Sequence, residues 1–88
     1  MLTVMIAEKD LLMADMLEES LLYAGYQVCG IARTVAEGIA LGELHRPDLA
    51  VLDLRLRHGG LGTEIAAQLD RKSGLGILYA TGMRGKSY

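Results

Sequence analysis

The sequence predicts a doubly wound, parallel α/β sheet. Two observations carry this prediction: short apolar runs alternate with segments of helical periodicity, and polar residues follow directly after the apolar runs. The clearest run, residues 49–52, has no polar side chain, which is typical of a strand buried on both faces. Asp53 comes immediately after it. Because ligands of open α/β sheets bind at the carboxyl ends of the strands, Asp53 is the first candidate for a reactive group.

The first third of the chain predicts a strand and a helix. Residues 2–7 are apolar except for Thr3, which favours a buried strand. Residues 11–24 then follow a helical period, with Asp10 as the N-cap and Gly25 just past the end. The buried face of this helix is expected to comprise Met13, Met16, Leu17, Leu21 and Ala24.

The middle of the chain predicts a second strand and a second helix before the run that ends at Asp53. Residues 26–32 form a weaker strand, and residues 34–37 fit a capping box that opens a helix reaching about His45. Two glycines inside this helix, Gly38 and Gly42, lower its intrinsic stability. The apolar side of the helix is expected to comprise Val35, Ile39 and residues 41–44.

The last part of the chain predicts a loop, a third helix and a fourth strand. An arginine- and glycine-rich loop over residues 55–60 precedes a helix from about residue 61 to residue 71. Residues 73–74 form a turn, and residues 75–80 form the fourth strand, which ends at Thr81. Right-handed crossovers between parallel strands then place helices on both faces of the sheet.

Composition limits the class of protein. The chain has 88 residues, sufficient for one small domain, and its net charge of −2 with scattered cations argues against a direct nucleic-acid partner. Its one cysteine, Cys29, excludes an internal disulfide and indicates a reducing compartment. No apolar run approaches the roughly 20 residues that span a bilayer, and no signal peptide is recognisable. We therefore expect a cytoplasmic domain without a membrane partner.

Three strand ends carry polar groups that could act together. Glu8 follows the first predicted strand, Asp53 the third and Thr81 the fourth. In a sheet with strand order 2-1-3-4, Glu8 and Asp53 flank one crevice, with Thr81 one strand further along. Two carboxylates attract a hard divalent cation such as Mg²⁺, and an aspartate can itself accept a phosphoryl group.

Three segments of the chain resemble one known family, the receiver domain of bacterial two-component response regulators. They are residues 4–10 (Val-Met-Ile-Ala-Glu-Lys-Asp), residues 47–54 (Pro-Asp-Leu-Ala-Val-Leu-Asp-Leu) and residues 76–82 (Gly-Ile-Leu-Tyr-Ala-Thr-Gly). The segments occur in the order and spacing of that family, and the likeness covers essentially the whole chain. It implies a flavodoxin-like (CheY-like) fold with strand order 2-1-3-4 and a single domain over residues 1–88.

The resemblance also implies a function and a set of site residues. Asp53 would accept a phosphoryl group from a histidine kinase or phosphotransfer protein, and Thr81 would contact that group. Glu8, the Asp53 carboxylate and the backbone carbonyl of Arg55 would bind Mg²⁺. The domain would act as a phosphorylation-dependent switch on a downstream protein partner. It would not be a turnover enzyme, although it would assist its own dephosphorylation.

One position departs from the family pattern and leaves an alternative open. Receivers usually carry two adjacent acids after the first strand, whereas this chain has Lys9 in the second position. The Lys9 ammonium could repel Mg²⁺ or pair with Asp53 in its place. The domain would then be a phosphorylation-independent interaction module, a pseudo-receiver. Asp10 would supply the missing metal ligand if its loop turns inward. A nucleotide- or flavin-binding domain is disfavoured because no glycine-rich loop follows the first strand.

The family pattern continues beyond the fourth strand with a further helix, a fifth strand and a last helix, so the likeness implies a C-terminally truncated receiver. The fourth strand would then form an edge of the sheet with exposed apolar side chains and unpaired backbone groups. We expect self-association through this edge. The side chains concerned are Leu75, Ile77, Leu78 and Tyr79.

Overall fold

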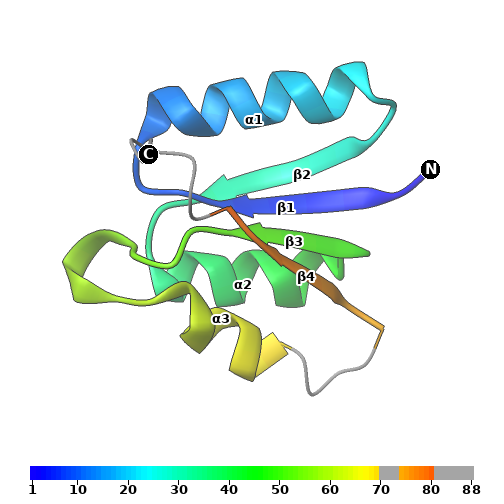
Figure 1. Cartoon of the computed structure of the whole chain (residues 1–88). Coiled ribbons are helices and arrows are strands. Elements are labelled where there is room, and N and C mark those ends of the chain that lie inside the picture. Colours follow the sequence, from blue (N-terminus) through cyan, green and yellow to red (C-terminus); the bar gives the residue numbers. More distant parts are fainter. Residues whose placement is uncertain (70–73, 81–88) are drawn as a thin grey trace.

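The computed structural model describes residues 1–69 and 74–80 and confirms the predicted fold class. Its four strands are all parallel and lie in the order β2-β1-β3-β4 (Figure 1). The predicted end of the third helix, the turn at residues 73–74 in part, and Thr81 lie outside the described residues. The elements are β1 (Thr3–Ala7), α1 (Leu11–Tyr23), β2 (Gln27–Ala32), α2 (Val35–His45), β3 (Leu49–Leu52), the 3₁₀ turn η1 (Arg57–Gly59), α3 (Gly62–Leu69) and β4 (Gly76–Tyr79).

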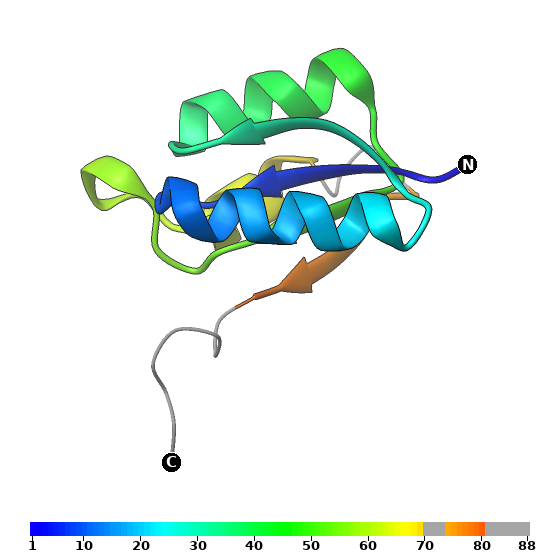
Figure 2. The same cartoon turned by 90° about the horizontal axis from the view of Figure 1, so that it is seen from above.

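The helices lie on both faces of the sheet. Figure 1 shows α1 on one side, and α2 with α3 on the other; Figure 2 gives the same arrangement from above. The side chains of β1 alternate between these faces, and Met5 belongs to the buried cluster that also contains Ile65 and Leu69 of α3. Val4 and Ile6 point to the α1 face and are equally buried. Both faces of β1 are therefore core, as a central parallel strand requires.

Two glycines of α2 let α3 approach closely. A Cβ at Gly38 would lie 2.4 Å from Ile65 Cδ1, and a Cβ at Gly42 would lie 2.4 Å from Leu69 Cδ1. Gly38 and Gly42 are four residues apart on α2, and Ile65 and Leu69 are four residues apart on α3. The isoleucine and leucine side chains therefore fit into the spaces that the two glycines leave. The two glycines lower helix propensity, and their role in the fold is to admit these side chains.

Side-chain caps begin α1 and α2 as the sequence predicts. Asp10 Oδ1 accepts hydrogen bonds from two backbone N–H groups of the first turn of α1. Thr34 Oγ1 accepts from the N–H of Glu37 at 3.1 Å. The return bond of the predicted capping box differs: Glu37 Oε1 accepts from the N–H of Arg33, one residue before the cap. The turn between β2 and α2 is therefore fixed from both sides.

The predicted apolar faces of the helices are correct only in part. On α1, Met16 and Ala24 are exposed, and Ala14 is the buried residue that the prediction missed. On α2, the Leu44 side chain is 76% exposed. Apolar spacing alone could not settle these positions, because an aliphatic residue beside the buried stripe fits the helical period almost as well as one within it.

Strand β2 contains a bulge at the cysteine. The register pairs Val4 with Val28 and Met5 with Gly30, so Cys29 is the extra residue on β2. Cys29 is half-buried, and burial raises the pKa of its thiol. The thiol is therefore neutral near pH 7 and a poor nucleophile.

The described helices include none that is long and apolar enough to cross a membrane.

Candidate functional site

Two acidic residues begin the loops after neighbouring strands. Ala7 of β1 pairs with Leu52 of β3, and the next residues along the two strands are Glu8 and Asp53. The ladder continues past the strands, because the Asp53 N–H donates to the carbonyl of Ala7 at 2.8 Å. The predicted proximity of Glu8 and Asp53 at the carboxyl end of the sheet therefore follows from the strand register.

The end of β4 meets the same edge of the sheet. The N–H of Ala80 donates to the carbonyl of Leu52 at 2.9 Å, directly before Asp53. Ala80 is the last described residue, so the predicted role of Thr81 stays a prediction.

Both acidic side chains are buried. Glu8 is 2% exposed and Asp53 is 7% exposed, the two buried charged residues among those described. Removing carboxylates from water costs free energy unless they gain hydrogen bonds or an opposite charge, and two adjacent carboxylates also repel each other. A positive charge placed near the two carboxylates would therefore be favourable.

The loop between β1 and α1 orients Glu8 and occupies Asp10. Glu8 Oε2 accepts a hydrogen bond from the N–H of Asp10 at 3.0 Å. The exposed Asp10 carboxylate uses Oδ1 to cap α1, as described above, so capping competes with the predicted role of Asp10 as a metal ligand. Lys9, between the two acids, is half-buried.

The loop after Asp53 is folded back on itself. Arg55 and Leu61 form an isolated antiparallel bridge, and the N–H of Leu56 donates to the carbonyl of Gly60 at 2.8 Å. The Leu56 side chain is buried in the core cluster and anchors this loop. Arg55 therefore stands two residues after Asp53 on a constrained backbone, and the metal-ligand role of its carbonyl stays a prediction.

Helix α3 packs directly against the backbone of Asp53. A Cβ at Gly62 would lie 2.1 Å from the carbonyl oxygen of Asp53, and the Gly62 N–H donates to the carbonyl of Leu54 at 2.9 Å. Only glycine permits this approach. Sequence spacing could not predict this contact between Gly62 and Asp53.

The residues present can hold a hard cation. The described part of the chain has no cluster of three or more His, Cys, Asp or Glu side chains suited to a metal ion. Mg²⁺, however, binds through one or two carboxylates together with water, carbonyl and phosphate oxygens. Glu8 and Asp53 supply two such carboxylates, and the donor set is therefore compatible with Mg²⁺.

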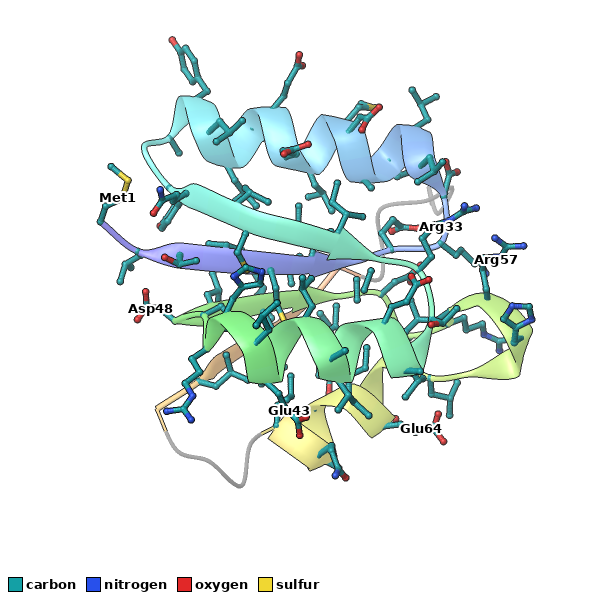
Figure 3. The ribbon with its side chains drawn as sticks, turned by 180° about the vertical axis from the view of Figure 1, so that it is seen from behind. Met1, Arg33, Glu43, Asp48, Arg57 and Glu64 are labelled. Carbon is teal, nitrogen blue, oxygen red and sulfur yellow. The ribbon has the colours of Figure 1, made fainter. Side chains whose placement is uncertain are left out.

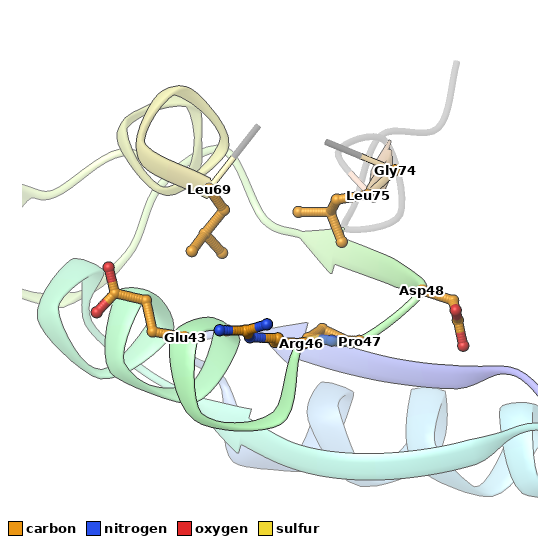
Figure 4. A pocket seen from close by; sticks show the side chains of 8 residues that line it. Glu43, Arg46, Pro47, Asp48, Leu69, Gly74 and Leu75 are labelled. Atoms are coloured by element: carbon orange, nitrogen blue, oxygen red, sulfur yellow. The ribbon is translucent and has the colours of Figure 1, made fainter. Parts of the chain in front are cut away.

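A pocket of about 630 Å³ lies at the opposite end of the sheet, near the starts of β3 and β4. Figure 4 shows Leu69 and Leu75 on one side of it, with Glu43 and Arg46 on the other. The sequence predicted no function there. The pocket is separated from Asp53 by the length of the strands, so it is not part of the acidic site.

The fold and the two buried acids together define a class: flavodoxin-like domains with an acidic site at the carboxyl end of the sheet. No family model matches the chain. The chain is 31% identical to the signal receiver domain of a modulated diguanylate cyclase from Desulfovibrio desulfuricans, with a TM-score of 0.85, covering 96% of this chain and 67% of that one. The chain therefore belongs to the response-regulator receiver domains, as the sequence predicted.

Longer proteins contain similar domains. The transcriptional regulatory protein PdtaR of Mycobacterium tuberculosis is 38% identical over 68 residues, which is 74% of this chain and 33% of that protein. The anti-anti-sigma factor PhyR of Bartonella quintana, solved in complex with the anti-sigma factor NepR, is 27% identical with a TM-score of 0.83; the match covers 89% of this chain and 32% of PhyR. The chain thus spans about a third of the length of the curated relative.

Proposed function

We propose that this receiver domain is a phosphorylation-dependent switch in which Asp53 accepts a phosphoryl group from a histidine kinase or phosphotransfer protein. The observation that supports this proposal is the burial of Glu8 and Asp53 side by side at the carboxyl end of the sheet. A surface aspartate would be solvated in many orientations, whereas Asp53 is buried and its backbone is held by the ladder bond to β1 and by the close approach of α3. Fixed orientation is what in-line phosphoryl transfer requires of its acceptor.

In the proposed reaction, an Asp53 carboxylate oxygen attacks the phosphorus of a phosphohistidine on the donor. An O–P bond forms while the P–N bond breaks, and the leaving imidazole nitrogen keeps the electron pair and takes up a proton. Glu8, Asp53 and the Arg55 carbonyl would hold Mg²⁺, which would neutralise charge on the phosphoryl oxygens. The Thr81 hydroxyl donates a hydrogen bond to the transferred phosphoryl group. The domain catalyses no turnover beyond its own dephosphorylation.

Acetyl phosphate with Mg²⁺, followed by intact mass measurement, tests the assignment of Asp53. We expect the unmodified chain to gain the mass of one phosphoryl group and Asp53→Asn to gain none, because the amide is not a nucleophile for this reaction. Asp15→Asn is the matched control, since Asp15 is an exposed aspartate on α1. A gain of mass in Asp53→Asn, or its loss in Asp15→Asn, would contradict the assignment.

A second candidate function is a phosphorylation-independent interaction module, and the position of Lys9 favours it. Lys9 is half-buried in the turn directly after Glu8. It occupies the position where receiver domains usually carry the second of two adjacent acids. Its ammonium can supply the positive charge that the buried carboxylates favour. A Mg²⁺ titration distinguishes the two functions: no response of the Asp53 amide resonance would favour this second candidate.

The output of either candidate is proposed to pass through a protein partner. The similar protein PhyR of Bartonella quintana, which was solved in complex with the anti-sigma factor NepR, supports this proposal. We place the domain in the cytoplasm, where a reduced Cys29 and a kinase phosphoryl donor would both be available.

Self-association through β4 is a further part of this proposal. Among the described residues, β4 pairs on one side only, with β3. Leu78 is 56% exposed and Tyr79 is 38% exposed. These two side chains form an apolar strip beside the edge of β4 that no described strand covers. Leu75 and Ile77 face the core cluster and are half-buried.

Sedimentation velocity over a range of concentrations tests the self-association. We expect the sedimentation coefficient to rise with concentration and Leu78→Lys to shift the association to concentrations about tenfold higher, because a charge on the strip must be desolvated. Leu44→Lys is the matched control, an exposed leucine on α2. A monomer at every concentration would contradict the proposal, as would equal effects of the two substitutions.

A further inference from the structure

Arg33 joins three loops at the carboxyl end of the sheet. Its backbone N–H donates to Glu37 Oε1 at 2.8 Å, and its carbonyl accepts from the N–H of Arg57 at 3.1 Å. Its guanidinium reaches a third loop, where Nη2 donates to the carbonyl of Lys9 at 3.4 Å. Figure 3 shows Arg33 and Arg57 together at this end of the molecule. The backbone of Arg33 is thus fixed on both sides while its side chain spans to the turn after β1.

The carbonyl that Arg33 contacts belongs to the peptide group whose N–H donates a hydrogen bond to the Glu8 carboxylate. The Lys9 carbonyl and the Asp10 N–H are the two polar ends of one planar peptide group. The Asp10 N–H donates to Glu8 Oε2 at 3.0 Å. Because the peptide plane is rigid, fixing its carbonyl end through Arg33 also fixes the direction of the N–H that orients the Glu8 carboxylate.

The Arg33 side chain is partly packed against the protein. Its Nε is buried and has no hydrogen-bond partner among the described residues, so the stem of the side chain is packed and not solvated. A packed arginine with one donor directed at a carbonyl can fix geometry. Its positive charge, by contrast, would weaken the binding of a nearby cation. Loss of the positioning contact should therefore lower the metal affinity, whereas loss of the positive charge should raise it. This difference in sign makes the role of Arg33 testable.

We propose that Arg33 is a positioning residue for the Glu8 carboxylate, acting through the Lys9–Asp10 peptide. This inference rests on the proposed function in one respect, namely that Glu8 is a ligand of Mg²⁺. The positioning itself can be measured without any phosphoryl transfer. Sequence reasoning did not single out Arg33, because its contact with Lys9 joins loops that are 24 residues apart.

The test compares Arg33→Met, Arg33→Lys and Arg57→Met with the unmodified chain. Arg33→Met removes the donor and the charge, whereas Arg33→Lys keeps a charge and a donor. Arg57→Met is the matched control, because it removes a neighbouring positive charge but keeps the N–H that bonds to Arg33. NMR measures two quantities in each variant: the hydrogen-exchange rate of the Asp10 amide relative to the Ala50 amide in β3, and the Mg²⁺ affinity from the Asp53 amide shift.

For Arg33→Met we expect the Asp10 amide to exchange about tenfold faster and the Mg²⁺ affinity to fall about tenfold, as is typical when a partner of a metal ligand is removed. Arg33→Lys should restore most of the slow exchange of the Asp10 amide and most of the Mg²⁺ affinity. Arg57→Met should leave exchange unchanged and bind Mg²⁺ equally well or slightly more tightly. Unchanged Asp10 exchange in Arg33→Met, tighter Mg²⁺ binding in that variant, or equal acceleration at Asp10 and Ala50 would each overturn the proposal.

Failure of the proposed function gives a different result. If the unmodified chain neither responds to Mg²⁺ nor gains a phosphoryl group, the phosphoacceptor function is wrong. The Asp10 exchange rates then decide alone whether Arg33 positions Glu8.

Discussion

Replacing Lys9 with aspartate is expected to raise the Mg²⁺ affinity of the domain about a hundredfold. Lys9 is half-buried in the turn directly after the buried Glu8, and one substitution there exchanges a positive charge for a negative one. Between a divalent ion and a charge about 6 Å away, a change of two units is worth about 2.8 kcal/mol even at the dielectric constant of water. The aspartate also supplies the hard oxygen ligand that Mg²⁺ prefers.

Titration with Mg²⁺, followed by the amide resonance of Asp53, measures this effect. Lys9→Met is the matched control, because it removes the charge of a long side chain without adding a carboxylate; its affinity should fall between those of the other two proteins. If Lys9→Asp binds Mg²⁺ no more tightly than the unmodified chain, the Lys9 side chain does not compete for the acidic site. The same three proteins, treated with acetyl phosphate, show whether tighter metal binding also accelerates phosphorylation of Asp53.

Replacing Gly62 with alanine is expected to lower the free energy of unfolding by about 3 kcal/mol, the upper part of the usual range for overpacking. The added Cβ would lie 2.1 Å from the Asp53 carbonyl oxygen, which is backbone and cannot rotate away. Either α3 or the Asp53 segment must move. Because Asp53 is the proposed acceptor, the folded fraction of this variant should also accept phosphate more slowly.

Urea unfolding measures the stability, and intact mass over time measures the phosphorylation rate. Gly76→Ala is the matched control, since a Cβ there would meet Leu49 Cδ1 at 3.3 Å and Asp48 O at 3.5 Å, with the flexible leucine tip as the nearest atom. That variant should lose less than about 1 kcal/mol. Equal losses of stability in the two variants would show that the tight contact at Gly62 has no special cost.

Local patterns in the sequence were sufficient for most of the fold. The apolar run over β3 and the alternation of strands and helices predicted a parallel sheet, and the strand order follows the family likeness. Asp10 and Thr34 were recognised as caps because a cap bonds to N–H groups within three residues along the chain. The adjacency of Glu8 and Asp53 could also be predicted, because parallel strands in known order bring their carboxyl ends together.

The same patterns could not predict how the elements meet. Met16 fits the helical period of α1 but is exposed, because the direction in which a helix faces the sheet is set by contacts distant in sequence. Gly38 and Gly42 weaken a helix when α2 is considered alone, yet they admit Ile65 and Leu69 once α3 is in place.

The sequence by itself therefore determined the class of fold, the strand ends and the acidic residues placed on them, since these depend on periodicity and on neighbours along the chain. The tertiary structure alone decided which side chains support the site. The contact of Gly62 with the Asp53 backbone joins α3 to the segment directly after β3, and the bond from Arg33 to Lys9 joins two separate loops. Their physical basis is the packing of helices on the sheet, which fixes distances that sequence spacing does not encode.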